Sequence, residues 1–166
     1  MRLKLLLLGV VVATFAIVQP LSAATATKNM TIGATVSATA TLTVSAATLT
    51  FPNSDPDTVP SIAASEGALT ITARAKTSTS GAVTLTLLAG GDLTSGTDTI
   101  AISNITWTVS GAGFVAGTMN KTTAQSVASW TGSGSRTGTQ TYALANSWNY
   151  PTGSYSAAAT YTLTAP

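Results

Sequence analysis

The sequence predicts an all-β protein, an immunoglobulin-like β-sandwich of about eight or nine strands that follows an N-terminal signal peptide. Apolar residues alternate with Thr, Ser and Gly through most of the chain, and turn-forming stretches separate the alternating runs. Such alternation places one side of each strand in the core and the other in water. A jelly roll, which is built from similar short strands, is the nearest alternative.

The chain begins with a pattern typical of a secretory signal peptide, which we assign to residues 1–23. Arg2 and Lys4 precede an uncharged apolar run that is short for a membrane span, and small residues follow it. Cleavage is expected after Ala23 or Ala24, and an uncleaved N-terminal anchor is the alternative. We therefore expect an exported protein that is periplasmic in transit, ends outside the cell or on its surface, and keeps no membrane span.

The composition of the expected mature chain fits a protein that packs against copies of itself. The sequence has seven basic and five acidic residues; the signal peptide holds two of the basic ones, so five of each remain and the net charge is zero. Those basic residues are scattered, whereas nucleic-acid binding needs clusters of them. Threonine occurs 33 times, while charged residues make up only 7%. With so few charges and a net charge of zero, the electrostatic repulsion between copies is weak.

The first alternating run, from Met30 to Val44, is long for a single strand. We divide it into an N-terminal extension (residues 24–37) and the first strand of a sandwich domain (residues 38–166). Further alternating runs lie at 69–75, 83–87, 100–102, 105–109, 142–144 and 155–163. Turn-forming stretches lie at 52–60, 78–81, 90–98, 111–117, 132–138 and 149–153.

The extension is a candidate donor strand. Its apolar residues, Met30, Ile32, Ala34 and Val36, share one face of an extended segment. Such a segment can complete the sheet of a neighbouring copy through main-chain hydrogen bonds. It can equally pair within its own chain, because both arrangements cover an exposed sheet edge. The sequence leaves the two alternatives open.

The residues needed for most enzymatic sites are missing. The chain has no His and no Cys, so the common catalytic triads and zinc sites cannot form. We expect no enzymatic activity and no cofactor. Asp55 and Asp57 flank Pro56 and could contribute oxygen ligands to calcium, although turn chemistry alone explains them.

The aromatic residues offer the other candidate site. Four of them occupy apolar strand faces and are expected in the core: Trp107, Tyr142, Tyr155 and Tyr161. Trp130, Trp148 and Tyr150 lie beside predicted loops and are the candidates for exposure. If they stack on sugars, the protein is a monomeric extracellular binding module for glycans or surface adhesion, which is our alternative function.

The two ends of the mature sequence resemble secreted families. The stretch Ile32-Gly-Ala-Thr-Val-Ser-Ala-Thr-Ala-Thr-Leu-Thr-Val-Ser with Leu49-Thr-Phe51, and the ending Gly153-Ser-Tyr-Ser-Ala-Ala-Ala-Thr-Tyr-Thr-Leu-Thr, are similar to spore-coat-protein-U-like proteins and chaperone–usher pilin subunits. The resemblance implies an incomplete immunoglobulin-like fold, an N-terminal donor strand, and homopolymers, as in a pilus, fibre or coat, assembled with a periplasmic chaperone. Those subunits commonly have a first-strand cysteine, where this chain has Ala40 and its neighbours.

Overall fold

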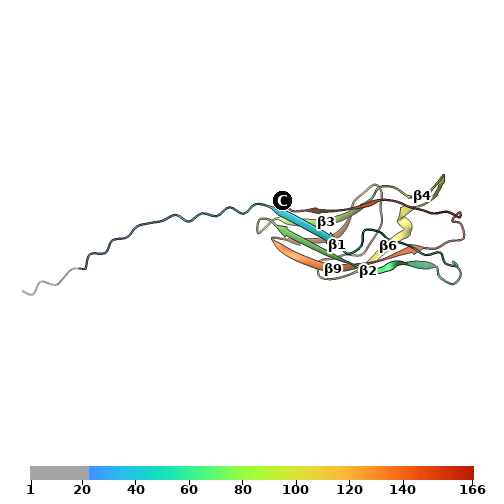
Figure 1. Ribbon diagram of the computed structural model, residues 1–166, viewed down its shortest axis with the longest axis horizontal. Helices are drawn as coiled ribbons and strands as arrows, with labels where there is room; N and C mark the ends of the chain where they lie inside the picture. Colours follow the sequence, from blue (N-terminus) through green and yellow to red (C-terminus); the bar gives the residue numbers. More distant parts are fainter. Residues whose placement is uncertain (1–22) are drawn as a thin grey trace, which may run out of the picture. The chain divides into compact units, whose positions relative to one another are not determined.

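A computed structural model describes residues 23–166, so the predicted signal peptide lies outside the described residues except for Ala23 (Figure 1). The chain divides into two units, Met1–Ala34 and Thr35–Pro166. We call the second unit the body; every strand among the described residues belongs to it. None of the helices in residues 23–166 has the length and apolar character needed to cross a membrane.

The prediction of an all-β protein is confirmed. Residues 23–166 contain ten strands and one short 3-10 helix, η1, which begins at Ile102 and ends at Asn104. The strands are β1 (Thr39–Val44), β2 (Ser61–Lys76), β3 (Ala82–Ala89), β4 (Leu93–Ser95), β5 (Asp98–Ile100), β6 (Ile105–Ser110), β7 (Gly117–Thr118), β8 (Gln125–Thr131), β9 (Gly134–Ala145) and β10 (Ala159–Thr164).

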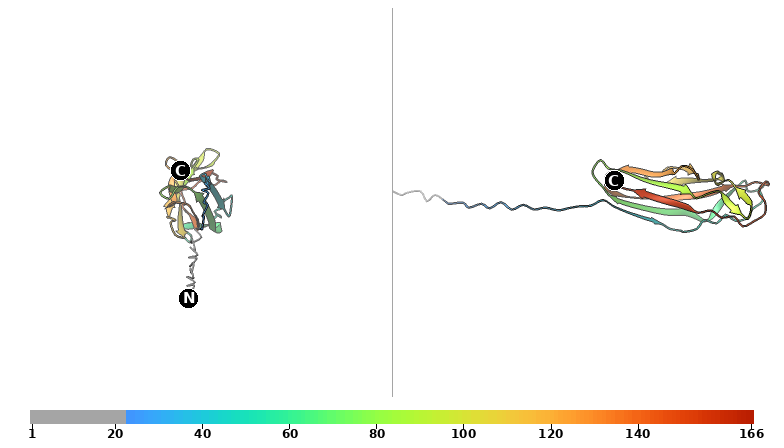
Figure 2. Two further views of the ribbon diagram at one scale, coloured as in Figure 1. Left: turned by 90° about the vertical axis from the view of Figure 1, so that its left-hand side faces the viewer. Right: turned by 90° about the horizontal axis from the view of Figure 1, so that it is seen from above.

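These strands form two main antiparallel sheets and a small hairpin. The larger sheet has the order β1-β2-β9-β6-β7, the smaller has the order β10-β3-β8, and β4 pairs with β5. The strands of both main sheets run along one common axis of the body (Figure 2). Each main sheet ends in a strand that has a ladder partner on one side only, namely β1, β7, β10 and β8.

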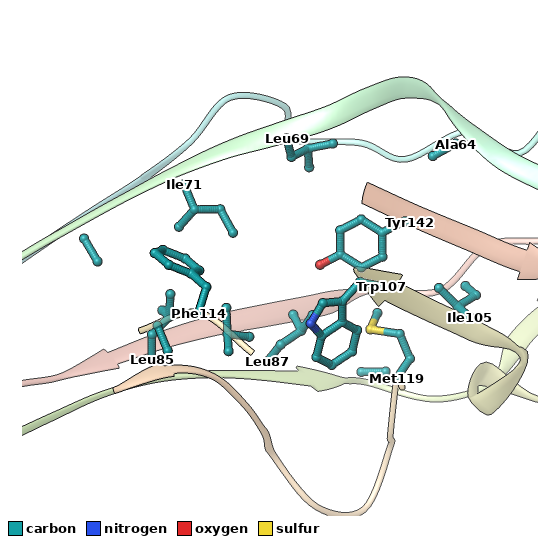
Figure 3. Close-up of a cluster of buried hydrophobic side chains, with 14 of the residues drawn as sticks. Ala64, Leu69, Ile71, Leu85, Leu87, Ile105, Trp107, Phe114, Met119 and Tyr142 are labelled. Carbon is teal, nitrogen blue, oxygen red and sulfur yellow. The ribbon is translucent and has the colours of Figure 1, made fainter. Parts of the chain in front are cut away.

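The apolar faces of the two main sheets share one core. Strict alternation along β2 and β3 buries Leu69, Ile71, Leu85 and Leu87, which are at most 3% exposed. Trp107 lies among them, with Met119 and Tyr142 close to its ring (Figure 3). Its ring centroid is 6.1 Å from that of Tyr142, in a tilted arrangement that is favourable for aromatic pairs.

Two elements differ from the prediction because sheet pairing overrides local turn signals. Residues 132–138 were expected to form a turn, yet β9 begins at Gly134 and pairs with β2 from Ala75↔Gly134 onward. Gly138 is needed because a Cβ there would lie 2.5 Å from Cδ2 of Phe114. A glycine that makes room for a neighbouring aromatic ring therefore cannot be distinguished in the sequence from a glycine of a turn.

Strand β8 was not predicted, because its buried residues do not alternate. Val127 and Ala128 are both fully buried, and the β3–β8 ladder is irregular between Leu85 and Thr86. Such a bulge breaks the period of two. Three smaller corrections follow: β4 lies within the expected 90–98 turn, Ile102 is in η1, and the last strand begins at Ala159 instead of 155.

Candidate strand-acceptor site

Strands β1 and β10 border one side of the body, where the two main sheets come close together. They contact each other, but no ladder joins them among the described residues. Thr39 of β1 pairs with Lys76, and the next residue, Thr77, donates a hydrogen bond through Oγ1 to the carbonyl of Pro166, just beyond β10. The start of β1 and the end of β10 therefore lie at one end of the body, as Figure 1 shows. We call this the terminal end and the opposite one the far end.

The inner face of β1 is only partly covered. Leu42 and Val44 are half-buried, whereas their ladder partners on β2, Ala73 and Ile71, are fully buried. Ala40, on the same face, is exposed. The core thus covers one side of Leu42 and Val44, and the other side is accessible to solvent.

The inner face of β10 repeats this pattern. Tyr161 and Leu163 are half-buried, while their ladder partners Leu87 and Leu85 are 2% and 0% exposed. Ala159 is exposed opposite a buried alanine of β3. Along this side of the body, the apolar side chains of both edge strands are therefore only partly covered. We call this side the open edge.

A buried polar bridge connects the open edge to the centre of the larger sheet. Tyr142 Oη donates to Gln140 Oε1 at 3.0 Å, and the hydroxyl of Tyr161 bonds both groups. Burial raises the pKa of Tyr142 and of Tyr161, so both hydroxyls stay protonated and can donate. Gln140 is fully buried, and its Nε2 has no partner in the described part of the chain. The sequence contains a signal for this burial, which was overlooked. Gln140 lies two residues before Tyr142, so the two side chains lie on the same face of the strand.

A separate hollow of about 420 Å³ lies at the far end, next to the start of β10. It is lined by residues 90–92, Thr94 and residues 156–158. Thr94 and Ser156 exchange two backbone hydrogen bonds of 3.0 and 3.1 Å, which hold the segment before β10 against the β4–β5 hairpin.

The predicted donor residues are exposed in this structure. Met30, Ile32 and Val36 are 79%, 84% and 75% exposed, Ala34 is also exposed, and residues 23–38 contain no strand. Exposed apolar side chains that share one face of a segment are typical of an interaction site. Whether they pair in the same chain or in another stays a prediction.

The three aromatic residues predicted to be exposed have different environments. Trp148 is 69% exposed, and its Nε1 donates to Asp57 Oδ1 at 3.0 Å. Tyr150 is half-buried, with its hydroxyl bonded to the carbonyl of Ala145. The prediction for Trp130 was wrong: it is 8% exposed, because it lies on the inner face of β8, where the Arg136 guanidinium covers its ring at 5.7 Å.

The predicted core aromatics are also divided. Trp107 and Tyr142 are fully buried, whereas Tyr155 and Tyr161 are half-buried. Asp55 adopts the turn role foreseen for it, since its Oδ1 accepts from the Asp57 amide at 2.9 Å. Across residues 23–166, no three acidic side chains gather into a group able to hold a metal ion.

No protein-family model, curated protein or solved structure matches this chain. The functional argument therefore depends on the open edge, on the exposed apolar segment that precedes β1, and on the distribution of polar groups in the body.

Proposed function

We propose that the mature chain is a secreted or cell-surface structural subunit, an incomplete immunoglobulin-like β-sandwich that self-associates into a pilus, fibre or coat. Residues 30–37 of one copy add as a strand between β1 and β10 of the next. The observation that carries this proposal is the open edge, whose inner side chains are half-buried where those of the neighbouring strands are fully buried. A donor strand covers the apolar side chains of both edge strands and completes both main-chain ladders.

The dimensions of donor and acceptor agree. β1 and β10 have six residues each. Met30 to Val36 spans a similar length, and its apolar side chains recur at every second residue, about 7 Å apart in an extended chain. The apolar side chains of the open edge recur at the same spacing, as in Leu42 and Val44. The four donor side chains can therefore each fill one position along the open edge.

The direction of the donor determines whether the assembly is open or closed. β1 begins and β10 ends at the terminal end, which is also where the extension joins the body. A donor parallel to β1 and antiparallel to β10 runs towards the far end of the acceptor, so copies follow one another head to tail. The reverse direction brings two terminal ends together and closes the assembly after two copies. A fibre therefore requires the donor to be antiparallel to β10.

Deleting residues 25–36 is the direct test of this proposal. The variant should stay monomeric in size-exclusion chromatography and negative-stain microscopy, while the mature chain forms filaments or ladders resistant to detergent. If the deletion variant still polymerises, the donor-strand proposal is wrong.

A matched pair of point variants separates the two faces of the extension. Ile32→Asp with Val36→Asp places charges on the inserted face and should abolish polymers. Thr31→Asp with Thr35→Asp introduces the same charges on the opposite face and should leave polymers in place.

Export and a periplasmic chaperone belong to the same proposal. An uncovered apolar edge invites aggregation, so a partner that occupies it in transit protects the subunit. N-terminal mass analysis of protein recovered from the periplasm or medium should find cleavage after Ala23 or Ala24. Retention of residues 1–23 would contradict export by signal cleavage.

A monomeric binding module is the second proposal, and the exposed Trp148 beside the Asp57 carboxylate favours it. An indole face next to a hydrogen-bond acceptor suits stacking on a sugar ring. Binding on a glycan array that is lost in Trp148→Ala would support this role. An array without signal from the wild type would exclude it.

A further inference from the structure

The charged side chains of the body are separated along its axis. Arg74 and Lys76 lie in the last residues of β2, beside Thr39 and Thr41 of β1, and Arg136 lies near the start of β9. All three are at the terminal end, and in the described chain no Asp or Glu side chain accompanies them there.

The far end is acidic. Asp55 and Asp57 lie in the loop that follows β1, Glu66 is at the bulge of β2, and Asp92 and Asp98 belong to the region of the β4–β5 hairpin. Lys121 is the one basic side chain of the described far end, and it pairs with Asp92 at 2.5 Å. Five carboxylates less one lysine leave four net negative charges at this end.

Both ends have surfaces that can receive a partner. At the terminal end, a hollow of about 480 Å³ opens on the outer side of the larger sheet; its polar lining is Thr39, Thr41, Arg74, Lys76, Ser133 and Ser135. Most of the surface of this hollow is apolar, but its lining includes Arg74 and Lys76, whose cations can bind carboxylates. At the far end, Asp55 and Asp57 are exposed, and one oxygen of each carboxylate accepts a hydrogen bond within the protein.

We propose that these two ends are complementary docking surfaces, so that the basic terminal end of one copy seats against the acidic far end of the next. The inference rests on the donor-strand proposal, which brings these ends together. A donor parallel to β1 brings the terminal end of its own body towards the far end of the acceptor, because β1 runs in that direction.

The separation of charge also selects the direction of assembly. A strand the length of β2, 16 residues, spans about 50 Å, several times the screening length of about 8 Å in physiological salt. The two ends of one body therefore do not neutralise each other in solution, and each acts on an approaching copy. Opposite ends attract and like ends repel, which favours head-to-tail assembly over closed pairs.

Charge reversal in the full mature chain tests this inference, with light scattering and negative-stain microscopy as readouts. Arg74→Glu with Lys76→Glu makes both ends acidic, and Asp55→Lys with Asp57→Lys reverses the far-end loop. Each variant alone should polymerise about tenfold more slowly than the wild type in low salt. An equimolar mixture of the two variants should recover the rate, because each altered end then meets its complement in the other chain.

Controls keep this result separate from that of the donor strand. Circular dichroism melts of Arg74→Glu with Lys76→Glu should match the wild type, because both side chains are exposed. Asp55→Lys with Asp57→Lys also removes two hydrogen bonds of the loop and should melt at a slightly lower temperature. The milder Arg74→Gln with Lys76→Gln should slow assembly about threefold, and 0.5 M salt should slow the wild type about tenfold.

The outcomes distinguish the two proposals. Wild-type rates in both reversal variants and at high salt would overturn the docking of the ends, and a monomeric 25–36 deletion would then leave the donor-strand proposal standing. A deletion variant that polymerises, or a wild type that does not, overturns both proposals.

Discussion

The two long edges of the body are covered in different ways. Opposite the open edge, the segment between β6 and β8 links both sheets by backbone hydrogen bonds. Val115 N donates to Val127 O at 2.9 Å, and Met119 N donates to Ile105 O at 2.8 Å. This segment buries Phe114 to 8% exposure. Its Val115 carbonyl also accepts from Trp107 Nε1 at 3.0 Å, so the edge is closed by the chain's own residues.

The β1–β10 edge has no comparable covering segment in residues 23–166, and its apolar side chains stay half-buried. The same physical requirement, covering a sheet edge, is therefore met internally on one side of the body only. Residues 30–36 have an exposed apolar face, and in our proposal this face covers the apolar side chains of the open edge. We expect the two edges to respond differently to mutation and to added ligand.

The largest expected effect lies at the closed edge. Trp107→Ala removes a ring that is 2% exposed and orphans the Val115 carbonyl, so it should lower the free energy of unfolding by about 3–5 kcal/mol. Urea unfolding followed by circular dichroism measures this. Thr108→Ala, on the exposed face of β6, is the control and should change it by less than about 0.5 kcal/mol. A similar loss in both variants would show that the closed edge is not packed as described.

Adding a donor should stabilise the open edge. A peptide of residues 25–38, added to the monomeric Ile32→Asp, Val36→Asp variant at about 100 times its dissociation constant, should raise the free energy of unfolding by about 2.7 kcal/mol. Thermal melts with and without peptide measure the change, and a scrambled peptide of the same composition is the control. The absence of any shift at saturating peptide would argue against an acceptor site.

Leu85 and Leu163 are ladder partners, so the same substitution at each compares a fully buried position with a position at the open edge. Leu85→Ala, at a fully buried position, should cost about 3–4 kcal/mol, whereas Leu163→Ala on β10 should cost about 1–2 kcal/mol, because its side chain is half in water. Urea unfolding of the monomeric variant gives both values. Equal losses would mean that β10 is already covered, contrary to the open edge.

The smallest effect concerns pH. Hydrogen bonds from Lys121 and from the Ile102 amide lower the pKa of Asp92. Its stabilising contribution is thus present above the ordinary carboxyl pKa of about 4 and is lost as pH falls through the lower folded value. Asp92→Asn should be less stable than the wild type at pH 7, and the difference should shrink as the pH falls below about 4. A constant difference across this range would exclude the ionised carboxylate as the cause.

Sequence reasoning succeeded where neighbours along the chain carried the information. Alternation predicted the all-β class, located β3 and β6 closely, and placed Trp107 and Tyr142 in the core. It failed for β8 and for the start of β9. In β8 a bulge breaks the alternation, and in β9 glycine is used to admit a ring, which a single sequence cannot distinguish from a turn.

The candidate site was only half predictable. The apolar face of Met30, Ile32, Ala34 and Val36 is visible in the sequence, because a strand repeats every two residues. The acceptor was not visible, since residues of β1 and β10 more than 100 positions apart form it. Nor was the burial of Trp130, which depends on Arg136 from another strand.

By itself, the sequence determined the class of secondary structure, the lack of His and Cys chemistry, and the balance of charges, because these depend on composition and local period. The tertiary structure alone decided which edge is open and which is closed. It alone gathered the basic residues at one end and the acidic residues at the other. Both features arise from the pairing of distant strands, whose order is determined by packing across the core and is not encoded in any short stretch of the chain.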